Sequence, residues 1–270
     1  MLRRVCSVLL AVLFACGCSR EADDSLKVGM ELGYPPFEMT DELGEPIGVS
    51  VDLAKALGEH LGRPVTFHNL PFDGLIPSLK TGKIDLVISS MTASEERAQS
   101  IDFSKPYVTT GLGLLVGADT DIQSIEDVRK PGRTVAVKKG TTGHVYASKH
   151  LPEASILVLD KETSCAVEVA QGKAEAFVYD QISVLQHWQQ NPTTTRALLQ
   201  PFQTEQWAIG VRKGNDALRN KVNGFLDAFA AKGGYDELTE RWLKKQKEAF
   251  DKLGVPFVFT SAAGKAPTQK

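Results

Sequence analysis

Arg97 is the side chain in this sequence best suited to hold an anion. It lies within SSMTASEERAQSIDFSKPY, residues 89–107, which follow a short apolar run, KIDLVIS, that predicts a buried strand. Thr92 and Glu95 have the spacing of a capping box, so we expect a helix to begin here with Arg97 in or near its first turn. A cation at this end of a helix is unfavourable unless an anion lies close by. That anion is either Glu95 or Glu96, or an external carboxylate bound by the planar guanidinium.

Polar residues also follow two other segments that predict strands, TVAVKK and EAFVYD. Ligand sites in open α/β sheets lie beyond the carboxyl ends of the strands, so we expect these residues at the same edge as Arg97. After TVAVKK, Thr141 and Thr142 occupy a glycine-flanked turn that enters a helix. The N–H groups of this turn could hold an anion, or the threonines could simply cap the helix. Asp180 ends EAFVYD, where it either caps the next helix or accepts hydrogen bonds from an ammonium.

Two aromatic residues lie on separate loops near this edge. Tyr34 belongs to GYPPFE, residues 33–38, whose two prolines predict a rigid extended loop, and Phe72 precedes a helix start at Asp73. Aromatic residues near helix starts are usually core residues. These two could instead form the walls of a slot for a ligand side chain.

The order of elements predicts an α/β fold. From Leu26 onward, segments typical of strands and helices alternate with short connections, which indicates mainly parallel, doubly wound sheets. A second unit of the same kind begins near Gly111, and amphipathic helices are expected at 216–232 and from 235 to about 247. The tail, 251–270, loses this periodicity.

The first residues predict export. Two arginines precede an apolar run, 5–15, which is too short to span a bilayer comfortably and is typical of a secretory signal peptide. The run ends in LFAC, which resembles the lipobox of bacterial lipoproteins and makes Cys16 the expected lipidated residue, with Cys18 a weaker candidate. An ordinary cleaved signal is the alternative. We therefore expect a signal peptide with lipobox at 1–18 and a polar tether at 19–25.

The composition excludes several classes of function. The 270 residues include 31 basic and 33 acidic ones, for a formal net charge of −2, and no basic cluster interleaves with aromatics, so nucleic acid is not an expected partner. The five histidines lack metal-ligand spacing, and no nucleophile-elbow, Walker or dinucleotide-binding motif follows a strand, so no metal or cofactor is expected. Cys165 is the one cysteine beyond the leader, and we expect a buried free thiol. One guanidinium, helix N–H groups, hydroxyls, a carboxylate and apolar walls suit binding an amino acid better than transforming it.

Several motifs together carry a family resemblance. They are GYPPFE at 33–38, FDGLIPSLKTGKIDLVISSMTASEER at 72–97, IDFSKPY at 101–107, KKGTTG at 138–143, VYD at 178–180 and the later ERWLKK. With them the chain, from Leu26 to about Lys245, resembles family 3 of the bacterial periplasmic solute-binding proteins. These are the polar amino-acid receptors of ABC importers, akin to lysine/arginine/ornithine-, glutamine- and cystine-binding proteins. Each motif alone is weak, whereas the set is specific.

The resemblance implies the two-lobed, type II periplasmic-binding-protein fold, in which each lobe is a mainly parallel sheet with flanking helices. Two crossing segments, here near 109–113 and 203–207, join the lobes, and a hinge closes them on the ligand. The implied boundaries are 26–110 and 205–250 for lobe 1, 111–204 for lobe 2, and 251–270 for a C-terminal extension.

The resemblance also implies roles for individual residues. Arg97 should bind the ligand α-carboxylate together with the backbone amides of Thr92 and Thr142. Asp180 and the Ser90 to Thr92 segment should bind the α-ammonium, while aromatic residues enclose the side chain. The predicted ligand-binding set is Glu31, Tyr34, Phe72, Ser89, Ser90, Thr92, Arg97, Thr141, Thr142 and Asp180.

Glu31 bears on which amino acid is bound. It falls where lysine/arginine/ornithine binders place an aspartate near the distal cation of the ligand. A carboxylate between aromatic walls favours an ammonium or guanidinium, so a basic amino acid such as arginine or lysine is preferred. Glutamine-type relatives also carry an acidic residue near this position, which makes glutamine or another polar amino acid the alternative. Glu31 could also face solvent or pair with a lysine.

The resemblance implies a monomeric receptor outside the cytoplasm, which delivers an amino acid to an ABC permease and contacts the membrane only through its lipid anchor. Cyclohexadienyl dehydratases also resemble this chain, but they carry a glutamate three residues after the strand-end aspartate. Ser183 stands there in this sequence, which disfavours an enzyme. A free-standing amino-acid sensor is a further alternative.

Overall fold

The computed structural model describes residues 24–256, and one mixed β-sheet forms their centre. The strand order is β4-β1-β5-β10-β6-β9-β7-β8, and a separate hairpin pairs β2 with β3. The strands are β1 (Leu26–Met30), β2 (Met39–Thr40), β3 (Pro46–Ile47), β4 (Val65–Asn69), β5 (Leu86–Val87), β6 (Ile101–Gly117), β7 (Thr134–Lys138), β8 (Ser155–Leu159), β9 (Ala176–Asp180) and β10 (Thr195–Arg212). β1 is parallel to β4 and β5, and β7 is parallel to β8 and β9. The predicted α/β class is confirmed.

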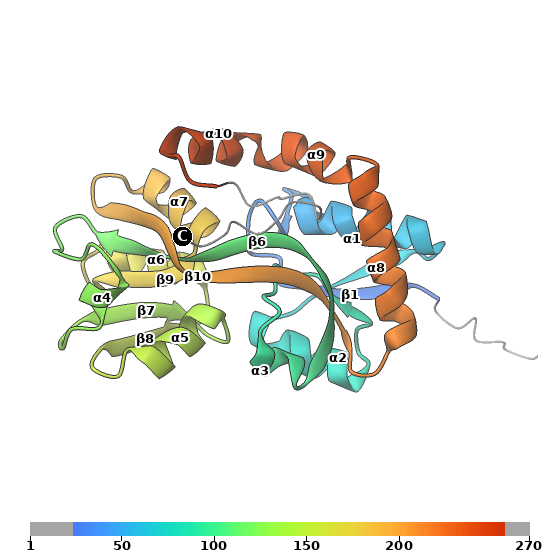
Figure 1. The fold of residues 1–270 in the computed structure, drawn as a ribbon, viewed down its shortest axis with the longest axis horizontal. Coiled ribbons are helices and arrows are strands. Elements are labelled where there is room, and N and C mark those ends of the chain that lie inside the picture. The colour runs from blue at the N-terminus through green and yellow to red at the C-terminus, as the bar shows by residue number, and fades with distance from the viewer. Residues whose placement is uncertain (1–23, 257–270) are drawn as a thin grey trace, which may run out of the picture.

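The long strands β6 and β10 join two lobes (Figure 1). Lobe 1 is built on β4, β1 and β5, and lobe 2 on β9, β7 and β8. The helices of lobe 1 are α1 (Val49–Leu61), the short η1 (Phe72–Gly74), α2 (Leu75–Thr81), α3 (Glu95–Ala98) and α8 (Asp216–Ala231). Lobe 2 carries α4 (Ile125–Val128), α5 (Thr142–His150), α6 (Glu162–Ala170) and α7 (Gln181–Gln190). After α8 come α9 (Gly234–Leu238), a π-helical turn (Thr239–Leu243) and α10 (Lys244–Leu253).

Both chain crossings lie inside one antiparallel ladder. Thr109 of β6 pairs with Gln206 of β10, and Leu112 pairs with Gln203, so the two predicted crossing segments lie side by side. The sequence predicts shorter strands here, but β6 and β10 continue through the crossings because each supplies hydrogen-bond partners to the backbone of the other. The predicted lobe boundaries fall within this ladder and stay a prediction.

Two local predictions near the site are wrong. Ser94, not Thr92, caps α3: its hydroxyl accepts a hydrogen bond from the Arg97 N–H at 3.3 Å. Thr92 instead forms a β-bridge with Trp207 of β10, which keeps its backbone extended. The GYPPFE loop is a closed turn rather than an extended segment, because the Tyr34 N–H donates to the Glu38 carbonyl at 2.8 Å.

The C-terminal helices extend further than the sequence predicts. α10 continues to Leu253 and ends at Gly254, whose φ of 66° is the left-handed conformation that favours glycine. The expected loss of helical periodicity from residue 251 therefore comes a few residues too early, and most of the predicted extension lies outside the described residues.

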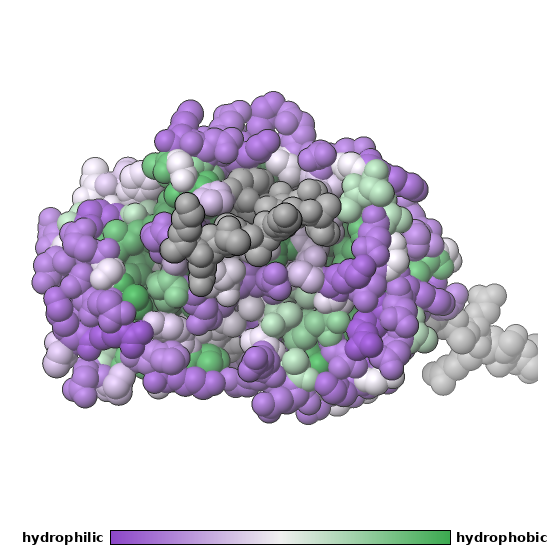
Figure 2. Space-filling view, viewed as in Figure 1, coloured by the Kyte–Doolittle hydropathy of each residue, from purple (hydrophilic) through white to green (hydrophobic). Residues whose placement is uncertain are grey.

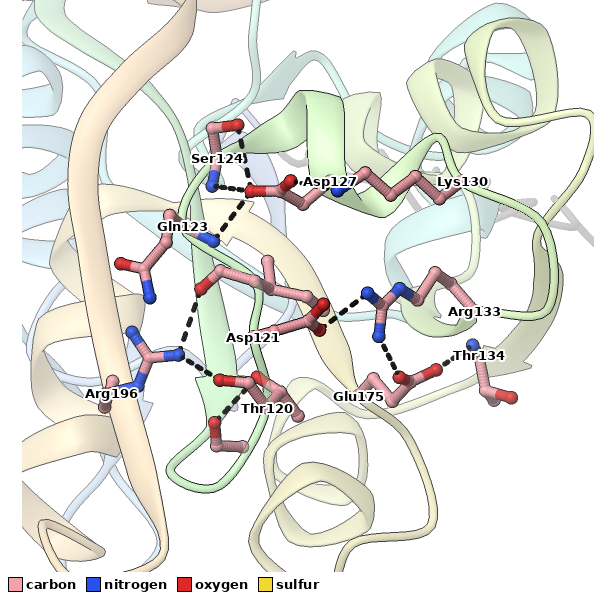
Figure 3. Close-up of polar contacts among 12 residues, drawn as sticks. Thr120, Asp121, Gln123, Ser124, Asp127, Lys130, Arg133, Thr134, Glu175 and Arg196 are labelled. Atoms are coloured by element: carbon pink, nitrogen blue, oxygen red, sulfur yellow. Dashed lines mark hydrogen bonds and ion pairs between the residues drawn. The ribbon is translucent and has the colours of Figure 1, made fainter.

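Lobe 2 is held at its outer end by charged side chains that bind backbone and one another (Figure 3). Arg133 forms ion pairs with Asp121 and Glu175, both at 2.6 Å, and Arg196 donates to the carbonyls of Thr120 and Ile122. These contacts fasten the connection between β6 and α4 to the neighbouring strands of lobe 2.

The visible surface and the leader complete the description. On the face in Figure 2, hydrophilic residues separate apolar areas over both lobes, the usual distribution on a protein surface. Among the described residues, helices long and apolar enough to cross a membrane are absent. The predicted signal peptide, Cys16 and most of the tether lie outside the described residues.

Cys165 is a buried free thiol, as predicted, and burial raises its pKa to about 12.

Gly143 provides a test of how tightly α5 packs on β9. A Cβ added at Gly143 would lie 2.5 Å from the carbonyl oxygen of Val178, which is backbone and cannot move aside easily. We expect Gly143→Ala to lower the free energy of unfolding by about 1–3 kcal/mol, as overpacked substitutions do. The control is Gly224→Ala in the exposed part of α8, where a Cβ meets nothing within 4 Å; it should stabilise by roughly 0.5–1 kcal/mol. Equal urea midpoints for both variants would contradict this packing.

Candidate functional site

One cavity lies between the lobes, and the ten residues predicted from sequence all line it. Lobe 1 contributes Glu31, Tyr34, Phe72, Ser89, Ser90, Thr92 and Arg97, and lobe 2 contributes Thr141, Thr142 and Asp180. The lining also includes residues that the prediction omitted: Glu38, Leu112, Lys138, Tyr179, Glu205 and Trp207. The structure thus brings the predicted residues together, while their roles toward a ligand stay predictions.

Arg97 reaches across the cleft. Its Nη1 donates to the Thr92 carbonyl at 2.8 Å, and its Nη2 donates to the Gly140 carbonyl of lobe 2 at 3.1 Å. These bonds use two of the five N–H groups that a guanidinium carries. Burial lowers the pKa of Arg97, although a guanidinium keeps its charge in proteins. Glu96, one of the anions considered for Arg97, instead pairs with Lys149 at 2.9 Å.

Asp180 caps the next helix, as one sequence interpretation predicted, and it also lines the cavity. As the N-cap of α7, it accepts hydrogen bonds from the backbone N–H groups of Ile182 at 3.0 Å and Ser183 at 3.1 Å. It also lines the cavity, and it is buried. Burial raises the pKa of Asp180 to about 7, because the charged form loses its contact with water. A cation placed beside Asp180 would stabilise its carboxylate form.

Thr141 likewise caps a helix and lines the cavity. Its hydroxyl donates to the Lys138 carbonyl at 2.7 Å and accepts from the His144 N–H at 3.3 Å, so it caps α5 as the simpler interpretation predicted. Thr142 is the first residue of that helix and also lines the cavity.

Aromatic rings form two parts of the wall. The Tyr34 ring packs against Phe37, Tyr179 and Trp207, with ring centroids 5.6, 6.1 and 6.0 Å away. Tyr34 is therefore both a core residue and part of the cavity lining. Phe72 lies apart from this cluster, under the Arg97 guanidinium, whose Cζ is 5.3 Å from the ring centroid.

Glu31 pairs with a buried lysine across the cleft. The partner is Lys138, the last residue of β7, whose side chain is only 4% exposed. This is the lysine pairing that the sequence left open for Glu31. The Lys138 Nζ also lies 5.5 Å from the centroid of the Phe72 ring. Glu31 is therefore half of an ion pair rather than an isolated carboxylate.

Glu38 is a buried acid that sequence reasoning missed. Ser90 Oγ donates to its carboxylate at 3.2 Å, and Ser89 Oγ does so at 3.5 Å. Burial raises the pKa of Glu38 to about 8, and the hydrogen bonds only partly offset this effect. Its position at the end of GYPPFE, one of the motifs that carry the resemblance, was the available signal.

Three ion pairs cross the cleft with the same polarity. In each pair lobe 1 supplies the carboxylate and lobe 2 the lysine. They are Glu31 with Lys138, Asp73 with Lys139 at 2.8 Å, and Glu96 with Lys149 at 2.9 Å. Opposite charge on the two facing surfaces attracts the lobes to each other.

Comparison with known proteins identifies the family. The model of the bacterial extracellular solute-binding proteins, family 3, matches residues 26–245. The chain belongs to this family. It is 32% identical over 241 residues to the ABC transporter arginine-binding protein 1 of Escherichia coli, covering 87% of this chain and 97% of that protein.

Solved structures of this kind share the fold. An ancestral arginine-binding protein bound to arginine is 37% identical, with a TM-score of 0.76, and the match covers 82% of this chain and 98% of that one. An ancestral arginine-binding protein bound to glutamine is 36% identical with a TM-score of 0.75, at the same coverage. The predicted family and its two-lobed fold are confirmed.

Two of the ion pairs across the cleft, Asp73–Lys139 and Glu96–Lys149, lie at its rim and are called the rim pairs. They predict that closure of this family-3 protein depends on salt. The side chains of both pairs are exposed, so their attraction should be modest at low ionic strength and weaker still when salt screens it. Changing both lysines to glutamate should therefore shift the ligand-free protein toward an open form with a larger radius of gyration in small-angle scattering.

The matched control for these charge reversals is Lys244→Glu. Lys244 pairs with Glu240 in the C-terminal helical region, so this variant also breaks an exposed pair, away from the cleft lining. A radius of gyration that is the same in the double variant and the control, at both low and high salt, would contradict a contribution of the rim pairs to closure.

Proposed function

We propose that this protein is an extracytoplasmic receptor that binds an amino acid between its lobes and delivers it to an ABC permease. The observation that carries the proposal is the placement of Arg97 and Asp180. They come from opposite lobes, line one cavity, and carry the charges that complement an α-carboxylate and an α-ammonium. A ligand that contacts both lobes stabilises the closed form over the open form.

In this proposal each end of the amino acid has its own partners. The α-carboxylate binds Arg97 and the backbone amides of Thr92 and Thr142. The α-ammonium binds Asp180 and the Ser90 to Thr92 segment. Tyr34 and Phe72 lie along the side chain, and Glu31 lies near its distal end.

The charges around the cavity favour a basic ligand. Four carboxyl groups and two cations line it: Glu31, Glu38, Asp180 and Glu205, with Arg97 and Lys138. An amino-acid backbone adds one charge of each sign and leaves this balance unchanged. Burial raises the pKa of Glu38 to about 8, so Glu38 carries a proton at neutral pH, and the carboxylate proposed to attract a distal cation is Glu31. Arginine or lysine is therefore the preferred ligand. The Escherichia coli relative and the arginine-bound ancestral structure point the same way.

Lys138 favours a second candidate. Because Lys138 already pairs with Glu31, the distal end of the cavity presents both a donor and an acceptor. A neutral amide has one group for each, whereas a cationic side chain would face the repulsion of Lys138. Glutamine or another neutral polar amino acid is therefore the alternative ligand.

The geometry supports binding rather than catalysis. Ser183 occupies the position at which related dehydratases carry a glutamate, and its hydroxyl donates to Glu162 at 3.2 Å. Glu162 lines an outer groove and not the cavity that holds Asp180. Ser183 supplies no carboxyl group where the related dehydratases carry their acid.

The remaining parts of the proposal concern location and assembly. We place the receptor on the outer side of the cytoplasmic membrane, as a monomer held there through a lipid on Cys16. Incorporation of labelled palmitate, and its loss in Cys16→Ala but not in Cys18→Ala, would establish the anchor.

Calorimetry with arginine, citrulline and glutamine tests the ligand. Citrulline has nearly the shape of arginine without its charge. If Glu31 attracts the cation, the protein should prefer arginine to citrulline by roughly tenfold or more, as hydrogen bonds to charged groups allow. Glu31→Gln should lose most of this preference while keeping its affinity for citrulline.

A variant of Arg97 and the ligand preference of the wild type distinguish whether the protein binds amino acids at all from which amino acid it prefers. Arg97→Ala should reduce the binding free energy of every amino acid by several kcal/mol, on the order of the 2–5 kcal/mol lost when one partner of a buried charge pair is removed. Wild-type protein that prefers glutamine or citrulline would move the assignment to the second candidate. Absence of binding by all the standard amino acids would overturn the receptor proposal.

Asp180 predicts how affinity depends on pH. In the empty cavity burial raises the pKa of Asp180 to about 7, so the group carries a proton below that pH. A bound ammonium favours the carboxylate and lowers this pKa. Binding should then release a proton below pH 7, and affinity should fall by up to about tenfold per pH unit of acidification, while it stays level above pH 7.

Proton release can be counted by calorimetry at pH 6 in buffers with different heats of ionisation. Asp180→Asn should bind more weakly and release fewer protons. A wild-type protein that releases none at pH 6 would contradict this role of Asp180.

A further inference from the structure

Glu205 is a buried carboxylate whose position the receptor proposal leaves unexplained. It lies on β10, where its backbone pairs with Thr110 of β6 inside the ladder that joins the lobes. Its residue is only 4% exposed, and it lines the cavity. A buried charge is costly unless other groups compensate for it, so its contacts indicate what it does.

The contacts of Glu205 set the direction of one hydroxyl. Thr92 Oγ1 donates to Glu205 Oε2 at 2.9 Å, and Gln203 Nε2 donates to Oε1 at 3.1 Å. An ionised carboxylate only accepts hydrogen bonds, and a hydroxyl has a single proton to donate. The Thr92 proton is therefore committed to Glu205, and the lone pairs of Thr92 Oγ1 are left to accept from another donor.

Backbone contacts hold Thr92 in this position. The Ala93 N–H donates to the Gln206 carbonyl at 2.8 Å, the Ala208 N–H donates to the Met91 carbonyl at 3.0 Å, and Thr92 itself bridges to Trp207. This short pairing fastens the segment before α3 onto β10 on both sides of Thr92. The backbone of Thr92 is therefore held beside β10, with its hydroxyl within hydrogen-bond distance of Glu205.

The surroundings of Thr92 match the ammonium end of a ligand. Asp180, the proposed partner of the α-ammonium, lines the same cavity from the other lobe. An ammonium can only donate hydrogen bonds, so its partner must be an acceptor. Thr92 Oγ1 is such an acceptor, because its own proton is donated to Glu205. The Glu205 charge adds attraction for a cation.

We propose that Glu205 is a positioning residue for recognition of the ligand ammonium: it orients the Thr92 hydroxyl as an acceptor and supplies negative charge behind it. The inference rests on the receptor function proposed above. It also gives the ladder between the lobes a direct part in ligand recognition, because Glu205 belongs to that ladder.

The test compares the affinities of two pairs of ligands, and the members of each pair differ only in the α-ammonium. The probes are L-arginine against 5-guanidinopentanoate, and L-glutamine against 4-carbamoylbutanoate, with affinities from calorimetry or from competition with a labelled amino acid. Glu205→Gln should lower the affinity for the amino acid roughly ten- to a hundredfold, in line with loss of charge-assisted binding. It should change the affinity for the analogue without the ammonium by less than about threefold.

Variants of Thr92 supply the matched controls. Thr92→Ser keeps the hydroxyl and should therefore keep the preference for the amino acid over its analogue without the ammonium. Thr92→Val removes the hydroxyl, so it should lose amino-acid affinity selectively, and adding Glu205→Gln to it should cost less than Glu205→Gln costs in the wild type. Melting temperatures identify any variant that has lost its fold. If Glu205→Gln does not fold, the affinities of Thr92→Val for the amino acid and its analogue are compared instead.

The outcomes separate the two proposals. Equal losses for the amino acid and its analogue in Glu205→Gln would mean that Glu205 is purely structural and would overturn the positioning role, while leaving the receptor function intact. Absence of amino-acid binding by the wild-type protein would overturn the receptor function itself.

Discussion

The antiparallel ladder between β6 and β10 is the constraint on which the rest of the structure depends. Both crossings between the lobes lie in it, and their backbone groups pair with each other rather than with water. A change in the angle between the lobes must therefore bend or twist a paired ladder. The cavity lies against it, since Leu112 and Glu205 of these strands belong to its lining.

Buried charge is the second organising feature. The cavity encloses more carboxyl groups than cations, and each burial carries a cost that neighbouring dipoles or opposite charges reduce. Asp180 accepts from two helix N–H groups, Glu38 from two serines, and Lys138 pairs with Glu31. These partners hold the charged groups in place before a ligand arrives, so less ordering is needed on binding.

Sequence reasoning succeeded where the information is local or follows from topology. Arg97 and Asp180 were found because they follow strands, and parallel strands bring their carboxyl ends to one edge. It failed where a distant partner overrides a local pattern. Thr92 has the spacing of a helix cap, yet β10 holds it in a bridge, and Ser94 caps α3 instead.

By itself the sequence determined the family, the two-lobed α/β architecture and ten of the residues that line the cavity, because motifs and alternating strands and helices are read from contiguous residues. Only the tertiary structure decided how the charged groups pair. Lys138 reaches Glu31 across 107 residues, Ser90 reaches Glu38 across 52, and Thr92 reaches Glu205 across 113. No local pattern encodes such contacts, since each forms only when the folded chain brings segments that are distant in sequence together.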